Sequence, residues 1–305
     1  MESMTDITRE VPTARSRLHE SLRLMRWQQW HKNAFVLIGF LALGEYSDFA
    51  LLARALINTL SFCLVSSAVY IFNDFWDREE DRKHPLKRHR PLAAGTVPLH
   101  HAFILGAILL VASFGLSMAN GKFSVLILAT YVANSVVYTL YFKELPILDV
   151  FLIAFGFMLR IFSGTLGIGI YVSEWLIITG FMVSLLIGFA KRYAELANHF
   201  EAQNHRGVLK NYSLETIKTF VIIMSSATIV TYALYTVSPR PMALHNTHRL
   251  IYTTPFVIFG IFRFLHLMFM NQTGEDPANL VITDKYLLFT IFGWLLTYGL
   301  MIGTA

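Results

Sequence analysis

The chain has 305 residues, of which 55% are apolar and only 15% are charged, and its mean hydropathy is +0.51. A soluble domain usually carries about 25% charged residues, so this composition excludes a water-soluble globular protein and indicates one embedded in a bilayer. The single cysteine, Cys63, excludes a disulfide framework.

Residues 1–32 contain no continuous apolar segment, and this absence predicts a polar N-terminal segment that lies in the cytoplasm. From residue 33 to residue 303, apolar runs of about twenty residues recur, and each can cross roughly 30 Å of hydrocarbon as a helix. We predict an all-α, polytopic membrane protein whose single domain, 33–303, is a bundle of nine transmembrane helices. The first predicted span is short and needs the preceding turn to reach full length. The spans are 33–44, 50–72, 101–118, 123–141, 146–169, 174–190, 215–238, 250–270 and 284–303.

The distribution of Lys and Arg predicts the orientation, because positively charged loops stay in the cytoplasm. With the N-terminus inside, twenty of the 25 Lys and Arg residues lie on the inner side, four lie outside, and Arg160 lies within a span. This bias predicts a protein of the cell (inner or plasma) membrane with a cytoplasmic N-terminus and active site and an external C-terminus. The net charge of +5 follows from the same topology and requires no nucleic-acid partner.

The segment 73–95 follows the second predicted span and places five acidic residues largely before six basic ones. If the helix continues, Asn73, Asp77 and Asp81 share one face, with Asp74 beside them. Such oxygen donors suit Mg²⁺, which takes one or two carboxylates together with substrate phosphates and water. The alternative is a solvated loop in which acids and bases neutralise one another.

This pattern, Asn73-Asp-x-x-Asp77-x-x-x-Asp81, resembles the first signature of the UbiA superfamily of intramembrane prenyltransferases. The resemblance implies a nine-helix bundle in which Asn73, Asp74, Asp77 and Asp81 are catalytic, by binding Mg²⁺ and the diphosphate of the donor.

The segment after the sixth predicted span departs from that family pattern. Superfamily members carry a second Asp-rich motif there, whereas this chain has Lys191-Arg-Tyr-Ala-Glu-Leu196. Two cations in place of carboxylates disfavour a second Mg²⁺ and favour direct capture of a phosphate by Lys191 and Arg192. The alternative is a pair of cations that only anchors a helix end on the cytoplasmic side.

This substitution and the basic segment after the first motif are similar to one branch of the superfamily, the decaprenyl-phosphate phosphoribosyltransferases. The similarity runs from Gln29-Trp-His-Lys-Asn33 through Glu275-Asp-Pro277 to Asp284-Lys285, and Arg26-Trp27 in place of Arg-Pro touches no proposed ligand. The resemblance implies Mg²⁺-dependent transfer of a 5-phosphoribosyl group from phosphoribosyl pyrophosphate to a polyprenyl (decaprenyl) phosphate, with inversion at ribose C1. It also implies a role in making an arabinan precursor of the cell envelope, and a homo-oligomer is compatible with it.

Further residues are predicted to bind the substrates. Lys32 and Tyr70 are candidate donors to phosphates, and the late basic residues, Arg90 among them, offer partners for the 5-phosphate and diphosphate. Arg160 lies about 16 Å along the helix from Asp149, and an ionisable residue at that depth marks a functional site or a buried pair. The predicted set is Lys32, Tyr70, Lys83, Lys87, Arg88, Lys143, Asp149, Arg160, Lys191 and Arg192.

Two other functions remain open at this point. A conventional prenyltransferase, which joins a prenyl diphosphate to an aromatic acceptor, would share the first motif but not Lys191-Arg192. A transporter would spread ionisable residues through the membrane midplane, whereas here the charge gathers at one face.

Overall fold

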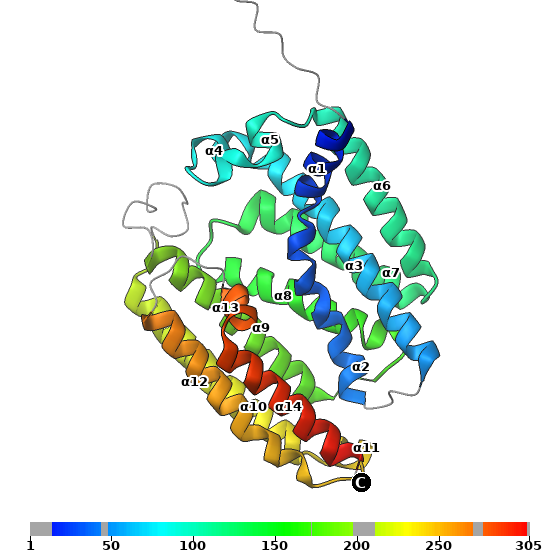
Figure 1. Cartoon of the computed structure of the whole chain (residues 1–305), viewed down its shortest axis with the longest axis vertical. Helices are drawn as coiled ribbons and strands as arrows, with labels where there is room; N and C mark the ends of the chain where they lie inside the picture. Colours follow the sequence, from blue (N-terminus) through cyan, green and yellow to red (C-terminus); the bar gives the residue numbers. More distant parts are fainter. Residues whose placement is uncertain (1–13, 44–47, 172, 198–210, 271–276, 304–305) are drawn as a thin grey trace, which may run out of the picture.

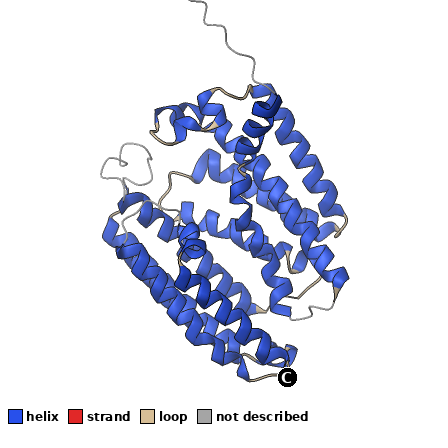
Figure 2. Cartoon of the chain, viewed as in Figure 1, coloured by secondary structure: helices blue, strands red, loops and turns tan. Residues whose placement is uncertain are grey.

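A computed structural model of the chain describes residues 14–43, 48–171, 173–197, 211–270 and 277–303. Within these residues every regular element is a helix (Figure 2), which confirms the all-α prediction. Eight helical segments are long and apolar enough to cross a bilayer. They are α3 (Phe49–Trp76), α6 (Leu99–Met118), α7 (Lys122–Val137) with a π-helical turn to Phe142, α8 (Leu148–Ser163) with η4 (Leu166–Ile168), α9 (Glu174–Ala197), α10 (Leu214–Val237), η7 (Arg249–Thr253) with α12 (Thr254–Met270), and α14 (Lys285–Gly303).

The first predicted span has a different form, a 3₁₀ helix η1 (Trp27–Leu37) followed by the short helix α2 (Ile38–Leu43). A 3₁₀ helix rises about 2 Å per residue, so η1 and α2 together reach roughly 30 Å, the thickness of the hydrocarbon layer. The segment lies directly against the end of α8, because a Cβ atom at Gly164 would collide with the carbonyl group of Val36. The nine predicted crossings are thus eight long helices and one broken segment in the described chain.

The remaining helices are short and lie mostly at the ends of the bundle. In Figure 1, α1 (Ala14–Met25), α4 (Arg78–Lys83) and α5 (Pro91–Ala94) gather at one end, and α11 (Pro239–Leu244) lies at the other. Leu24 of α1 packs against Ala68 and Ile71 of α3 and Leu92 of α5. The N-terminal helix therefore folds onto the segment that carries the acidic motif. Two more short elements are η2 (Lys87–His89) and α13 (Pro277–Thr283).

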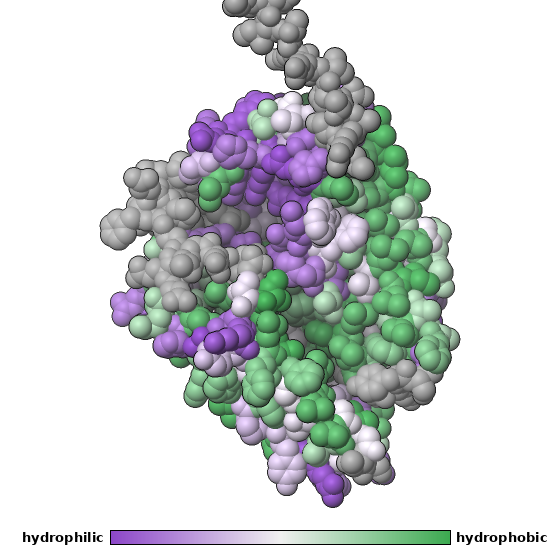
Figure 3. Space-filling model, in the orientation of Figure 1, coloured by the Kyte–Doolittle hydropathy of each residue, from purple (hydrophilic) through white to green (hydrophobic). Residues whose placement is uncertain are grey.

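Polar contacts hold the long helices together where lipid gives no hydrophobic driving force. The side chain of Asn58 on α3 donates to the Ser163 carbonyl oxygen (2.7 Å) and accepts from Asn120 (2.8 Å) and Ser124 (2.7 Å). These bonds join α3, α7 and α8 away from the acidic end. At that end the surface is hydrophilic and hollowed, whereas apolar residues cover most of the rest of the face in Figure 3.

Candidate active site

The acidic residues lie where α3 ends and α4 begins. Helix α3 ends at Trp76, and Asp77 (φ −89°, ψ 3°) leaves the helical conformation before α4 starts at Arg78. The chain stays coiled, because the Asp77 N–H donates to the Asn73 carbonyl oxygen (2.9 Å) and the Asp81 N–H donates to that of Asp77 (2.8 Å). The backbone therefore keeps the predicted spacing, with a change of direction at Asp77.

Two of these residues face the end of α7. The Asn73 side-chain oxygen accepts a hydrogen bond from Thr139 (2.7 Å), and Asp77 lies 2.7 Å from the Nζ atom of Lys143. Burial alone would lower the pKa of Lys143, but the hydrogen bond and charge of Asp77, with the charge of Glu80, outweigh it and raise this pKa. Lys143 is therefore a permanent cation beside the predicted metal ligands.

The other two acids face α5 and the N-terminal helix. Arg90 Nη1 lies 3.2 Å from Asp74 and 2.6 Å from Asp81, and both carboxylates are buried. The Arg26 guanidinium also binds Asp74 and lies 5.1 Å from the centre of the Tyr70 ring. Arg26, which matches the Arg of the expected Arg-Pro pair, thus contacts the proposed ligand Asp74 directly, whereas the departure itself lies at Trp27.

The prediction that the acidic residues share one continuous face also needs correction. Asp81 accepts a hydrogen bond from Arg90, which also donates to Asp74, whereas Asn73 and Asp77 contact Thr139 and Lys143. Within the described ranges, no three Asp, Glu, His or Cys side chains are close enough to hold a metal ion by themselves. One carboxylate oxygen, Oδ2 of Asp74, is nevertheless buried without a hydrogen-bond partner. Such an oxygen is costly to bury alone, and a cation would satisfy it.

The helix around Lys191 and Arg192 is longer than predicted, because α9 continues to Ala197 instead of ending at residue 190. The helix turns Arg192 into the bundle, where it is 1% exposed and lies 2.6 Å from Asp149 and 2.5 Å from Glu195. Arg192 is therefore ion-paired with two carboxylates in the structure. The direct capture of a lipid phosphate that the sequence predicts for Arg192 is not seen in this arrangement. Lys191 is half-buried.

Asp149, at the start of α8, also forms a hydrogen bond with Tyr212. The Tyr212 hydroxyl donates to Asp149 Oδ1 (3.1 Å) and accepts from the backbone N–H of Ile147. Burial, with the neighbouring carboxylate, raises the pKa of Tyr212 to about 12. The start of α8 and the end of α9 are thus joined by a buried, fully paired cluster, a structural role for Asp149.

Arg160 lies on α8 within the predicted span, and it is only 5% exposed, as that position predicts. It donates to the side-chain oxygen of Asn33 (2.8 Å), to Gly156 O (2.8 Å) and to the Tyr131 hydroxyl (3.1 Å), and three aromatic rings surround it. No carboxylate in the described part of the chain forms an ion pair with it. Of the two alternatives, a buried ion pair is therefore not observed. Its bond to Asn33 fixes η1 against α8.

The basic residues after the motif lie around the turn from α4 to η2, at the same end of the molecule. Lys83 and Arg88 are exposed and Lys87 is half-buried. Arg23 of α1 donates to the His89 carbonyl oxygen (2.8 Å) and fastens this turn to the N-terminal helix. The turn thus carries cations within reach of solvent beside the acidic residues.

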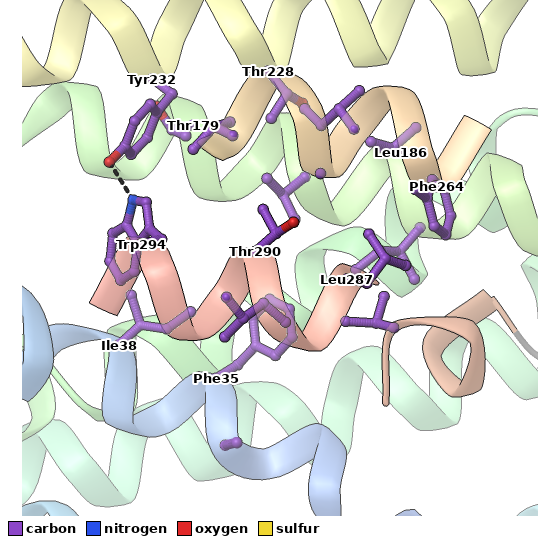
Figure 4. A pocket seen from close by; sticks show the side chains of 18 of the residues that line it. Phe35, Ile38, Thr179, Leu186, Thr228, Tyr232, Phe264, Leu287, Thr290 and Trp294 are labelled. Atoms are coloured by element: carbon purple, nitrogen blue, oxygen red, sulfur yellow. Dashed lines mark hydrogen bonds between the residues drawn. The ribbon is translucent and has the colours of Figure 1, made fainter. Parts of the chain in front are cut away.

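An apolar cavity of about 750 Å³ opens next to η1. Lys32 and His31 line it, together with apolar side chains of α9, α10, α12 and α14 (Figure 4). Leu287 and Phe264 lie toward one end of the cavity, and Tyr232 and Trp294 lie at the other. A long apolar molecule with an anionic head would match this lining.

Sequence reasoning missed the direct contact of Arg26 with the acids. The usable signal was its position: a cation just before the first span, on the same side of the bilayer as the acidic motif. Two further residues of the resemblance, Glu275 and Asp276, lie outside the described residues.

Comparison with known proteins decides the family. The UbiA prenyltransferase family profile matches residues 33–302. This chain belongs to the UbiA prenyltransferase family. It is therefore a multi-pass membrane enzyme and a transferase, which argues against the transporter alternative.

The decaprenyl-phosphate phosphoribosyltransferase of Corynebacterium glutamicum is 31% identical over 90% of this chain and 83% of its own length. The enzyme of that name from Mycolicibacterium smegmatis is 30% identical over 91% of each chain.

Solved UbiA structures share the fold. A UbiA homologue from Archaeoglobus fulgidus bound to GPP and Mg²⁺ superposes with a TM-score of 0.69 at 18% identity, covering 94% of this chain and 100% of its own. The apo UbiA homologue from Aeropyrum pernix gives a TM-score of 0.64 at 16% identity, over 94% of this chain and 98% of its own. The A. fulgidus protein has also been solved with Cd²⁺, so divalent cations bind within this fold.

Proposed function

We propose that this enzyme transfers a 5-phosphoribosyl group from phosphoribosyl pyrophosphate to a polyprenyl phosphate such as decaprenyl phosphate and releases pyrophosphate. The observation that carries the proposal is the end of α9. There Lys191 and Arg192 stand in place of a second acidic motif, and Arg192 forms ion pairs with both Asp149 and Glu195. A second metal would have to displace this guanidinium, and the Tyr212 hydroxyl as well, to bind Asp149. The names of the bacterial relatives support the same reaction.

The acidic residues at the α3–α4 junction fit Mg²⁺ in their chemistry. They supply four oxygen-bearing side chains, and Asp74 holds a buried oxygen without a donor. We propose that Asn73, Asp77 and Asp81 would hold the ion, with Asp74 bound to it or to its ligands, once Asp81 is released from its ion pair with Arg90. When bound, Mg²⁺ would offset the negative charge that builds on the departing pyrophosphate.

The cations around these acids have a second role in the proposal. Arg26, Arg90 and Lys143 balance the carboxylates in the structure as described. When a metal ion takes over that role, their N–H groups become available to phosphate oxygens, which they bind strongly. Lys83, Lys87 and Arg88 extend the basic surface toward the 5-phosphate, and Tyr70, beneath Arg26, offers a hydroxyl donor.

The acceptor lipid occupies the cavity beside η1 in this proposal. Its polyprenyl chain lies against the apolar walls, and its phosphate lies at the mouth near Lys32, with Lys191 as a second cation. Arg160 holds this arrangement indirectly, because its bond to Asn33 fixes the residue next to Lys32. It is a positioning residue and is not proposed to touch substrate.

The chemistry requires no general base. The bond from ribose C1 to the pyrophosphate oxygen breaks, with its electron pair leaving on pyrophosphate, and an oxygen of the lipid phosphate forms the new bond to C1. Attack from the opposite face inverts C1. Because the acceptor is already an anion, no proton is removed, and catalysis rests on positioning and electrostatics in a site shielded from water.

We further propose that the acidic end faces the cytoplasm in the cell membrane, that the C-terminus lies outside, and that 33–303 forms one catalytic domain. The excess of Lys and Arg on one side supports this orientation. The soluble donor would then reach its site from the cytoplasm, while the lipid enters from the bilayer.

The second candidate is a conventional prenyltransferase, which the neighbour bound to GPP favours. Purified protein incubated with ribose-labelled phosphoribosyl pyrophosphate and polyprenyl phosphate separates the two. We expect a labelled lipid that forms with Mg²⁺, disappears when EDTA is added, and returns with excess Mg²⁺. No labelled lipid under any of these conditions, with labelled prenyl transfer to an aromatic acceptor instead, would establish the rival.

A further inference from the structure

The large cavity continues into a second cavity of about 310 Å³. On α14 the main cavity is lined from Leu287 to Trp294, and the second by Trp294 and Tyr298. On α9, which runs in the opposite direction, the main cavity reaches Ile187 and the second reaches Leu176. Both helices therefore place the second cavity about a turn deeper than the first, away from the acidic end.

A hydrogen-bonded aromatic pair lies where the two cavities meet, among the six residues that line both. Tyr232 and Trp294 line both of them, and the Trp294 indole N–H donates to the Tyr232 hydroxyl (2.6 Å), as the dashed line in Figure 4 shows. The Tyr232 hydroxyl also lies 2.6 Å from the Thr253 hydroxyl, and the Trp294 ring stacks on Tyr298 with centroids 5.0 Å apart. In a nonpolar setting such bonds are strong and directional, so the two rings are held in place at this junction, and we refer to the pair as the partition.

The opposite end of the main cavity has a different character. His31 and Lys32 line the main cavity but not the second. From Leu287 to Trp294 the cavity follows α14 for about 10 Å. An apolar chain whose anionic head lies near Lys32 therefore meets the Tyr232–Trp294 pair after it has filled the main cavity. A longer chain has to pass that pair to remain inside the protein.

We infer that the second cavity is a subsite for the distal isoprene units of the acceptor lipid, and that Trp294 with Tyr232 determines which chain lengths enter it. The inference rests on the proposed function, which places the acceptor's chain in the main cavity. The occupant is a polyisoprenoid, because the walls of both cavities are almost entirely apolar and the head-group end is cationic. Trp294 and Tyr232 are thus specificity-determining residues.

Binding of polyprenyl phosphates of graded length tests the subsite without requiring turnover. Full-length protein in nanodiscs is titrated with a short and a long polyprenyl phosphate in competition with one radiolabelled lipid phosphate. Trp294→Ala removes the partition, and we expect the ratio of long-chain to short-chain affinity to rise about tenfold. Leu176→Trp narrows the second cavity without touching the main one, and the same ratio should fall. Phe292→Ala, an exposed ring on the same helix, is the matched control and should leave the ratio unchanged.

The outcomes separate the subsite from the reaction. If the ratio is the same in wild type, Trp294→Ala and Leu176→Trp, or if no polyprenyl phosphate binds, the subsite is overturned. Phosphoribosyl transfer, measured in parallel on the wild type, addresses the reaction alone. A ratio that moves as expected without any transfer would support the subsite and overturn the proposed reaction. If Trp294→Ala fails to fold, Leu176→Trp still decides the question, because it adds a side chain without opening the partition.

Discussion

The Asp149–Arg192 ion pair gives the sharpest prediction, because Arg192 is buried against Asp149, whereas the sequence predicts that it binds the lipid phosphate. Its two side chains are 0% and 1% exposed and lie 2.6 Å apart. Arg192→Met leaves Asp149 buried with only the Tyr212 hydrogen bond. Removing one partner of a buried pair costs about 3–5 kcal/mol. For a chain of this size, that cost corresponds to a fall in the unfolding midpoint of roughly 5–8 °C.

A double variant separates the structural role from a role in binding. Asp149→Leu with Arg192→Met replaces the pair by apolar groups, which is often neutral or stabilising. Glu195 loses a partner too, but it is 25% exposed and can be hydrated. We therefore expect each single variant to melt well below the wild type and the double variant to recover most of the loss. Thermal unfolding in detergent micelles measures this, with the exposed Arg88→Met as a control that should not shift the midpoint.

The reasoning would be refuted by an Arg192→Met protein that melts like the wild type but no longer binds polyprenyl phosphate. That result would show that the guanidinium contacts the lipid and that its bond to Asp149 contributes nothing to folding.

Three further predictions follow from the site. Asp77→Asn should reduce turnover by about 100-fold or more with little change in melting, because Asp77 is partly exposed and its proposed work is to hold the metal; normal turnover in steady-state assays would remove it from the ligand set. Lys191→Ala should raise KM for the polyprenyl phosphate more than KM for phosphoribosyl pyrophosphate, and equal effects on both would argue against a contact with the lipid. The pKa of Tyr212, about 12 in the fold, exceeds the value of about 10 for a free tyrosine. The folded state therefore keeps this proton longer than the unfolded state, so the contribution of Tyr212 to stability is complete below about pH 10 and is lost as the pH rises toward 12. The melting midpoint of the wild type should fall over that interval more steeply than that of Tyr212→Phe, and parallel curves would contradict this.

The membrane fold was predictable because each span is a long apolar run, and hydropathy alone locates such runs in the sequence. The second predicted span, 50–72, corresponds to α3 (Phe49–Trp76), and the third ends at Met118 as predicted. The first span was harder. Its 3₁₀ geometry depends on close contact with Gly164, more than 120 residues later, which no local pattern reports.

The site was predictable in its residue types but not in its pairings. The spacing of Asn73, Asp77 and Asp81 identified the acidic cluster, and the backbone keeps that spacing. The sequence did not show that Asp74 and Asp81 would share Arg90, or that Arg192 would turn inward. Both facts depend on where a helix ends, Trp76 for α3 and Ala197 for α9, and helix ends are the least certain part of such reasoning.

The most direct test of the central claim offers the purified protein both donors at once. Phosphoribosyl pyrophosphate with decaprenyl phosphate, and a prenyl diphosphate with an aromatic acceptor, are supplied together with Mg²⁺, and the lipid products are identified by mass spectrometry. We expect a phosphoribosylated lipid phosphate, formed in equal amount to pyrophosphate and lost in Asp77→Asn. A prenylated aromatic compound as the sole product would contradict it.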